Sequence, residues 1–252
     1  MRSADSAGRP FAGRAFEAAP SPFAGDDGTA PPAFLAAHAD LVAGRAGPEA
    51  VVDALREARL LVPLLADLGE AGEREGRRIE KSAELALVTV AGPDGRRVLP
   101  AFSSAAAMAA WNPAARPVPA PARQVALGAV ADGTELVIVD PGSPTSFGLR
   151  RGALEALARE LPWSPPWRDP SVRAALSAPA FAEPAIAGVG VGTDDPDCSL
   201  EGAEVRVVLA VRPVLDRDGL AVLVERIRAA WTADDVVAAR VDSLAVRIEA
   251  AG

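Results

Sequence analysis

The chain has 252 residues and a net charge of −8, with 50% hydrophobic and 24% charged residues, which is typical of folded rather than disordered proteins. Its length suits one large domain or two ordinary ones. Its acidic net charge disfavours a nucleic-acid partner, because proteins that bind phosphate groups present an excess of basic charge. The single cysteine, Cys198, excludes an intramolecular disulfide and a cysteine-rich metal site. There is no apolar run of about 18 residues to suggest a membrane span. The polar N-terminus, MRSADSAGRP, lacks an apolar signal core, so we expect a cytoplasmic protein.

Residues 1–46 are predicted to form an N-terminal arm. The segment is rich in Gly, Pro and Ala, yet it contains Phe11, Phe16, Phe23 and Phe34. A solvated linker rarely carries so many phenylalanines. Two interpretations follow: the rings pin a loose segment onto its own domain, or the arm packs on a second subunit.

A regular pattern begins at Pro48, where proline in a first turn predicts a helix over residues 48–58. A strand follows over 59–66, and Pro63 within it indicates an edge strand or a bulge. The mixed charges and glycines of residues 69–84 predict a solvated loop.

Two apolar runs, 85–91 and 96–102, flank the turn sequence GPDG. Asp-Gly supplies the positive φ that a tight turn needs, so these runs predict a β-hairpin. The next segment, SSAAAMAAW, predicts a helix whose free N–H groups Ser103 or Ser104 can cap.

Further along, residues 120–133 predict a helix with an apolar face, and residues 134–141 predict a mostly apolar strand at a sheet centre. The expected face of that helix comprises Ala122, Val125, Ala126, Ala129 and Val130. Residues 150–162 predict another helix, with Leu154, Leu157, Ala158 and Leu161 facing inward.

The proline-rich segment WSPPWRDP, residues 163–170, indicates a domain boundary, and we expect Trp163 and Trp167 to pack between the two domains.

The remaining residues predict a smaller module of two strands, a helix and a strand. The strands are expected at 185–192 and 204–212, the helix at 218–231 and the last strand at 242–250. The sequence therefore predicts an α/β (α+β) protein: an arm at 1–46, a mixed sheet with flanking helices over 47–168, and a ββαβ domain over 169–252.

Several segments, in this order, resemble the SseB protein family in its actinobacterial forms. They are FAGDDG, RLLVPLLA, KSAELALVTVAGPDGRRVLPAFSS, AAWNPAARPVP, ELVIVDPGSP and ELPWSPP. The resemblance begins near residue 20, and residues from 203 onward are similar to the smaller C-terminal domain of that family. The resemblance implies the two-domain organisation above. It implies no catalytic residues at positions of this chain, because the family is named for an enhanced-serine-sensitivity phenotype and not for an activity.

Residue types that support catalysis are few. A Ser-His-Asp arrangement would need His38, which shares a helical face with Phe34 and Leu41 and is therefore expected to be a structural residue. Ser103 and Ser104 follow a strand and open a helix, as some nucleophiles do, but capping explains them without further assumptions. The glycines of 188–192 precede an acidic turn and not a helix, which argues against a nucleotide site.

The densest acidic cluster lies in one loop and comprises Asp194, Asp195, Asp197 and Glu201. A weak calcium site there is conceivable, although the spacing is not that of an EF-hand and a solvated loop is the simpler interpretation. Cys198 in this loop is expected to be an exposed thiol with a pKa raised by the neighbouring carboxylates.

Two functions remain open. The first is a non-catalytic binding or regulatory module that engages a protein partner or itself, with possible interaction residues Phe11, Phe16, Phe23, Trp163 and Trp167. The second is an enzyme or amino-acid-type binding protein with a site in the groove between the domains, built from groups such as Asp140, Ser143 and Thr145. We expect no cofactor, no metal, no nucleic acid and no membrane partner.

Overall fold

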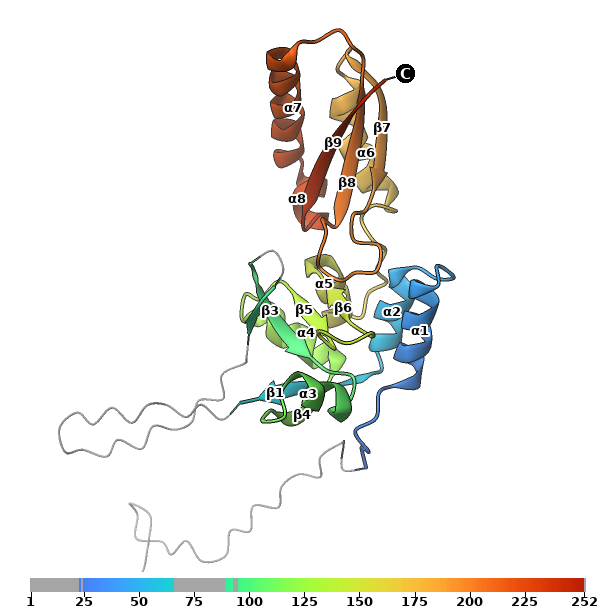
Figure 1. The fold of residues 1–252 in the computed structure, drawn as a ribbon, viewed down its shortest axis with the longest axis vertical. Coiled ribbons are helices and arrows are strands. Elements are labelled where there is room, and N and C mark those ends of the chain that lie inside the picture. Colours follow the sequence, from blue (N-terminus) through green and yellow to red (C-terminus); the bar gives the residue numbers. More distant parts are fainter. Residues whose placement is uncertain (1–22, 24, 66–88, 93–94, 252) are drawn as a thin grey trace, which may run out of the picture.

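The computed structural model describes residues 23, 25–65, 89–92 and 95–251 (Figure 1). The elements of the first part are α1 (Pro32–Val42), α2 (Pro48–Leu55), β1 (Arg59–Leu64), β2 (Val90–Ala91), β3 (Arg97–Ala101), α3 (Ala105–Trp111), β4 (Arg116–Pro121), α4 (Ala122–Ala131), β5 (Val137–Val139), β6 (Phe147–Leu149) and α5 (Arg151–Ala158). Those of the second part are α6 (Pro170–Phe181), β7 (Ile186–Gly192), β8 (Val205–Val211), α7 (Arg217–Thr232), α8 (Asp235–Arg240) and β9 (Leu244–Ala250).

The first part contains a four-stranded mixed sheet in the order β2-β3-β5-β6 and a separate antiparallel pair, β1-β4. Strands β3 and β5 are parallel, so their carboxyl ends lie at the same edge, while β2 and β6 flank them in antiparallel pairing. The expected mixed sheet is confirmed, and β5 lies inside it as predicted for the apolar strand. Because parallel neighbours end together, Phe102 and Ser103 after β3 are brought beside Asp140 after β5.

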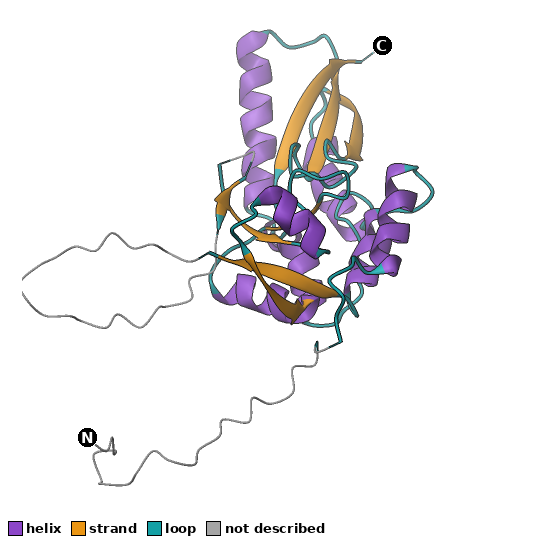
Figure 2. Ribbon diagram, turned by 60° about the horizontal axis from the view of Figure 1, so that its bottom comes forward, coloured by secondary structure: helices purple, strands orange, loops and turns teal. Residues whose placement is uncertain are grey.

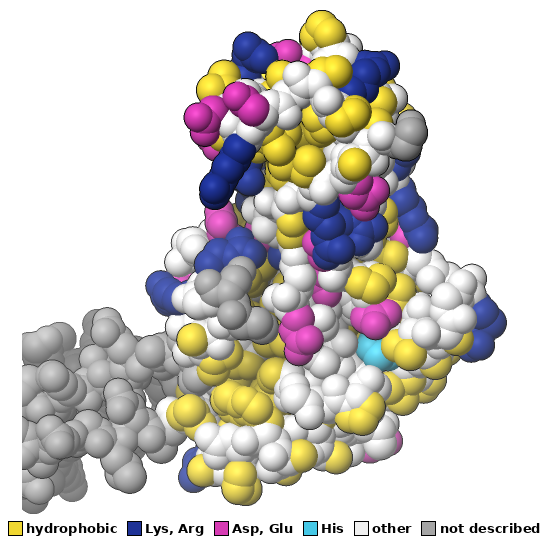
Figure 3. All heavy atoms as spheres, turned by 45° about the horizontal axis from the view of Figure 1, so that its top comes forward, with side chains coloured by type: hydrophobic (Ala, Val, Ile, Leu, Met, Phe, Trp, Pro, Cys, Tyr) yellow, Lys and Arg dark blue, Asp and Glu magenta, His cyan; other side chains and the backbone are white. Residues whose placement is uncertain are grey.

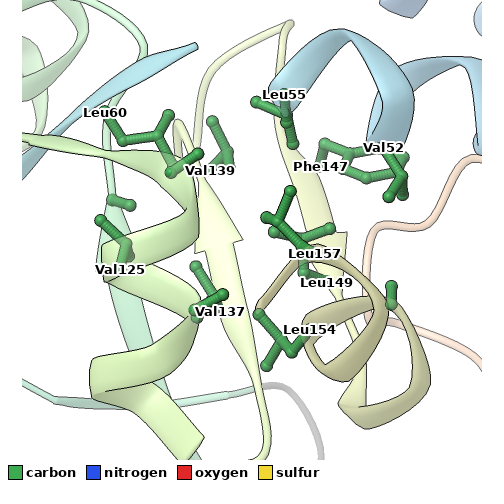
Figure 4. Close-up of a cluster of buried hydrophobic side chains, with 14 of the residues drawn as sticks. Val52, Leu55, Leu60, Val125, Val137, Val139, Phe147, Leu149, Leu154 and Leu157 are labelled. Carbon is green, nitrogen blue, oxygen red and sulfur yellow. The ribbon is translucent and has the colours of Figure 1, made fainter. Parts of the chain in front are cut away.

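The core of this part forms where α1, α2, α4 and α5 pack against the strands. Figure 4 shows side chains from both helices and strands converging on one cluster, among them Leu60, Val137, Phe147 and Leu154. Pro48 opens α2 at its first turn, as the sequence predicts, and leaves its apolar face against the core.

The predicted hairpin is present in the residues described. Val90 pairs with Val98, and the turn is closed by hydrogen bonds from Gly92 N–H to the Arg96 carbonyl and from Gly95 N–H to the Gly92 carbonyl. Gly95 has a φ of 80°, the left-handed conformation that the Asp-Gly pattern predicts.

The second part is a three-stranded sheet with helices packed on one face (Figure 2). Alternate residues of β8, from Val205 to Val211, are buried, because they face α6, α7 and α8. The Trp231 indole N–H of α7 donates to the Leu176 carbonyl of α6 at 2.8 Å, so the two helices are joined by a buried hydrogen bond. The overall fold is α+β with a smaller C-terminal sheet domain.

Four elements were not predicted. Strand β4 was missed because it contains three prolines, and β6 because it has only three residues inside a turn-like segment. Helix α6 contains Pro179 near its end, and α8 has only six residues. The expected ββαβ order is therefore preceded by α6 and extended by α8.

Two core predictions were wrong. Leu161 was expected to face inward, but α5 ends at Ala158 and leaves Leu161 51% exposed. Val130 lies at the end of α4 and is also exposed, whereas the other four residues of the predicted face are buried. The error at Leu161 comes from extending a helical pattern past the end of α5, whereas Val130 lies within α4 and is exposed in its last turn.

The described part of the expected arm contains α1, in which Phe34, His38 and Leu41 are buried against the core as their spacing indicates. We therefore propose that any arm ends before Pro32. Phe11 and Phe16 lie outside the described residues. The boundary at 168/169 also remains a proposal. It is supported by two main clusters of buried side chains: the first contains residues from Phe34 to Ala158, joined by Cys198, and the second contains residues from Val172 to Val237.

Leu154 and Leu161 make a matched pair for testing this packing. Leu154 is fully buried, so Leu154→Ala is expected to lower the free energy of unfolding by about 2–5 kcal/mol through the cavity it leaves. Leu161→Ala is expected to change it by less than about 0.5 kcal/mol, as for other exposed substitutions. Urea titration measures both, and similar losses for the two variants would contradict the helix end at Ala158.

Candidate functional site

The first polar cluster lies at the carboxyl ends of β3 and β5. The Ser103 hydroxyl donates to one Asp140 carboxylate oxygen at 2.5 Å, and the Ser103 backbone N–H donates to the other at 2.7 Å. The Thr145 hydroxyl also donates to Asp140, at 2.8 Å, and lies 2.9 Å from the Ser143 hydroxyl. Asp140 is fully buried and has a φ of 51°, a left-handed conformation that aspartate tolerates better than most residues.

This cluster joins the adjacent strand ends by hydrogen bonds. The groups considered for a small-molecule site, Asp140, Ser143 and Thr145, are brought together, but they bond one another. Ser104 caps α3, because its hydroxyl accepts from the Ala107 N–H at 3.1 Å. His38 donates from Nε2 to the Ser146 carbonyl at 3.2 Å, so no Ser-His-Asp arrangement forms among the described residues.

The second polar cluster centres on Arg150, at the junction of the two parts of the chain. One terminal nitrogen donates to Asp195 at 2.6 Å and to the Gly202 carbonyl at 2.6 Å. The other donates to Asp242 at 3.0 Å and to the Ser243 hydroxyl at 3.1 Å. All of these groups come from the C-terminal domain, so one buried arginine of the first part binds two of its segments, the loop between β7 and β8 and the residues before β9.

Both carboxylates are bonded further. Arg96, at the base of the hairpin, donates to both oxygens of Asp242 at 2.9 Å each. Burial alone would raise the pKa of Asp242, but the hydrogen bonds from Arg96 and Arg150 lower it overall. Asp195 accepts from the Ser199 and Leu200 backbone N–H groups, which folds the 195–200 loop around its side chain.

Glu204 is a third buried acid of this junction. Its carboxylate accepts the Asp242 backbone N–H at 2.7 Å, and its own N–H donates to the Ser243 hydroxyl. Burial, followed by the charge of Asp242, raises the pKa of Glu204 to about 7.

The acidic loop was expected to be solvated, and the structure shows this for Asp197 and Glu201, which are exposed, but not for Asp194 and Asp195. Asp195 is buried against Arg150, and Asp194 accepts from both Arg206 and Arg247 at 2.8 Å. Cys198 was expected to be exposed and is buried, and this burial, with Asp195 nearby, raises the pKa of its thiol to about 12. No group of three or more potential metal ligands occurs in the part of the chain that the structure describes.

Trp163 and Trp167 are half-buried and pack against the core of the first part. Together with Arg150, Cys198 and Glu204 they line a cavity of about 10 Å³, which is room for one water molecule. A bound amino acid would need a far larger space, so the described junction provides no such site.

Phe23 lines a shallow open hollow of about 480 Å³ together with Asp26, Asp27, Thr29, Ala30, Pro31, Pro32 and Arg59. Arg59 holds this segment: it donates to Asp26 at 2.5 Å, to the Thr29 carbonyl at 3.0 Å and to the Ser103 carbonyl at 2.7 Å. The pKa of Asp26 is lowered by this arginine. Residues 26–29 are therefore fixed to β1 and to the end of β3.

The chain was compared with known proteins. Residues 33–156 match the family described as SseB protein N-terminal domain. No curated protein and no solved structure matches the chain. Among the described residues, no helix is long and apolar enough to cross a membrane.

The raised pKa of Glu204 predicts a pH-dependent stability. Because the folded state favours the protonated acid, this contribution is complete below the ordinary pKa of 4.5 and is lost as the pH rises through about 7. At about 1.36 kcal/mol per pKa unit, the loss is on the order of 3 kcal/mol. Glu204→Gln should remove it, so the difference in unfolding free energy between the wild type and the variant should change across this range. A constant difference from pH 4.5 to 7 would contradict the assignment.

The buried position of Ser103 predicts a structural role. Ser103→Ala is expected to cost about 1–3 kcal/mol of unfolding free energy, because the buried Asp140 carboxylate loses a donor. Ser104→Ala, which removes only the helix cap, should cost about 1 kcal/mol. A fluorophosphonate probe should label neither serine in the folded protein, and labelling of Ser103 would show that its hydroxyl is accessible.

Proposed function

The chain belongs to the SseB protein family, and we propose that it acts as a non-catalytic binding module that engages a protein partner or a second copy of itself. The observation that carries this proposal is a concentration of exposed apolar side chains at one end of the C-terminal domain. The polar groups suited to chemistry, by contrast, are buried and bonded to one another at the Asp140 and Arg150 clusters.

We call this surface the distal end and define it by residues 181–186, 211–222 and 248–251. Strand β8 runs away from the junction with the first part, so the loop after Val211 lies far from it (Figure 1). That loop lies beside the turn after α6, because the Arg212 N–H donates to the Ala185 carbonyl at 2.8 Å. Segments distant in the sequence therefore build one surface.

The distal end exposes large apolar side chains from each of these segments. Phe181 is 59% exposed and Val214 is 67% exposed. Leu215, Val222 and Ile248 of the same segments are also exposed, and Figure 3 shows apolar atoms gathered over this part of the domain. Isolated exposed apolar side chains are ordinary, but a group of them, rimmed by charged residues, is typical of protein interaction sites.

Further features are consistent with this proposal. The net charge of −8 supports a protein and not a nucleic-acid partner, and we propose a cytoplasmic location. We also propose that residues from 203 onward form the C-terminal domain of the same family. Phe11, Phe16, Phe23, Trp163 and Trp167 stay secondary candidates for contact, with Phe23 supported by its position in the hollow beside Arg59.

Affinity capture from the native cell at low salt tests the proposal. The wild type is expected to retain a stoichiometric protein, either a second copy or a different chain. The double variant Phe181→Ser/Val214→Ser should retain at least about tenfold less, since each lost apolar contact weakens association. The matched control, Val42→Ser/Val130→Ser, alters exposed valines of α1 and α4 and should behave as the wild type.

Two outcomes would contradict the proposal. One is a wild-type chain that is strictly monomeric and retains no stoichiometric protein. The other is a rise in melting temperature with a millimolar amino acid, which would instead support a small-molecule site in the inter-domain groove.

A further inference from the structure

We propose that the partner is a second copy of this chain, which pairs antiparallel with β9 about a two-fold axis at Ile248. Two three-stranded sheets then become one continuous six-stranded sheet. This inference rests on the proposed function, because it names the partner of the distal end and the strand that binds it.

Strand β9 is an edge strand of the sheet β7-β8-β9 and has seven residues. The Ser243 carbonyl accepts from Val205 and the Ala251 N–H donates to Val211, so alternate residues from Ser243 to Ala251 bond to β8. In a parallel pair the intervening residues direct both their N–H and C=O groups away from the neighbour. The groups of Leu244, Val246, Ile248 and Ala250 therefore point outward, in position to form a ladder.

The other edge strands described are protected against such pairing. Strand β7 has a bulge between Ile186 and Gly188, and arginines donate to its carbonyls at Ile186 and Val191. Strands β1 and β4 contain prolines, β6 has only three residues, and β2 has two in the part of the chain that the structure describes. Bulges, prolines and short length are the usual ways in which proteins prevent edge pairing. Strand β9 has none of them.

The charges of β9 select one register. An antiparallel pair centred on Ile248 places Arg247 opposite the partner's Glu249, and the symmetry repeats this contact, giving two pairs of opposite charge. A centre at Arg247 would oppose two arginines, and a centre at Glu249 would oppose two glutamates. A centre at Val246 would place Arg247 opposite an alanine. Opposite charges in facing positions stabilise a sheet, and like charges destabilise it.

The apolar side chains agree with the same register. Residues 244, 246, 248 and 250 lie on the helix-covered face, and Leu244 and Val246 already pack on the domain core. Centring on Ile248 places the two Ile248 side chains opposite each other and Val246 opposite the partner's Ala250. Ile248 is 44% exposed in the single chain, and this pairing would cover it. An isologous two-fold interface of this kind closes on itself and forms a dimer, not a fibre.

Sedimentation velocity of the full chain over a concentration series tests the inference. The wild type is expected to be a dimer, and Glu249→Arg should weaken it by about tenfold or more, because two Arg–Glu pairs become Arg–Arg pairs. Glu225→Arg makes the same charge change on an exposed position of α7 and should leave the dimer intact. Circular dichroism confirms that each variant is folded.

A mixing experiment identifies the register. Arg247→Glu alone should also weaken the dimer, since it places two glutamates opposite each other, although it removes the contact with Asp194 as well. A mixture of Arg247→Glu and Glu249→Arg chains should form heterodimers, which native mass spectrometry detects when one chain carries a tag. The double variant in one chain, Arg247→Glu/Glu249→Arg, should restore the homodimer.

The outcomes separate this inference from the proposed function. A monomeric wild type that still retains a different protein at the distal end would overturn the β9 dimer and leave the binding function standing. A monomer that retains nothing would overturn both. A dimer unaffected by Glu249→Arg would place the interface elsewhere and overturn the β9 register.

Discussion

Arg150 joins the two parts of the chain through its guanidinium group, which bonds Asp195, Gly202, Asp242 and Ser243 in the C-terminal domain. Burial opposes its ionisation, but the two carboxylates raise its pKa, so the charge is held inside the protein. A buried ion network adds little net stability, yet the removal of one member leaves the others unpaired at a cost of several kcal/mol. We infer that Arg150 fixes the orientation of the two domains more than it stabilises either one.

Asp140 is likewise a buried charge held by hydrogen bonds. Its carboxylate accepts from the hydroxyl and the backbone N–H of Ser103 and from the Thr145 hydroxyl. There the adjacent ends of two parallel strands are held, and the left-handed backbone at Asp140 directs its side chain back to β3. In both clusters the polar side chains of the kinds that catalysts use are hydrogen-bonded to one another and hold the fold together. The remaining space at the junction holds about one water molecule.

The proposed binding function therefore rests on exposed apolar side chains and on backbone groups without a partner strand. The exposed apolar side chains gather at the distal end, and the free backbone groups lie along β9. Because the junction fixes this domain on the first part, a partner bound at β9 would be placed in a defined position relative to the SseB N-terminal domain. That arrangement supports the binding function proposed above.

Local pattern was sufficient to predict much of the fold from the sequence. Periodicity and turn chemistry predicted the hairpin, the capped helix α3, the central strand β5 and the buried face of α1, because these depend on residues near one another in the chain. The serines at 103 and 104 were predicted as caps, and one of them is. Short or proline-rich strands such as β4 and β6 carry too little pattern to be recognised, since only pairing with distant residues makes them strands.

Tertiary structure alone decided the environment of the acidic loop and of Cys198. Asp195 looked solvated because its partner, Arg150, lies 45 residues away, and no local pattern records which arginine a carboxylate will meet. Likewise, the alternation of β9 was visible in the sequence, but its position at an unprotected edge followed only from the strand order. Local residues thus determined which elements form, while long-range pairing determined which charges are buried and which backbone groups remain free.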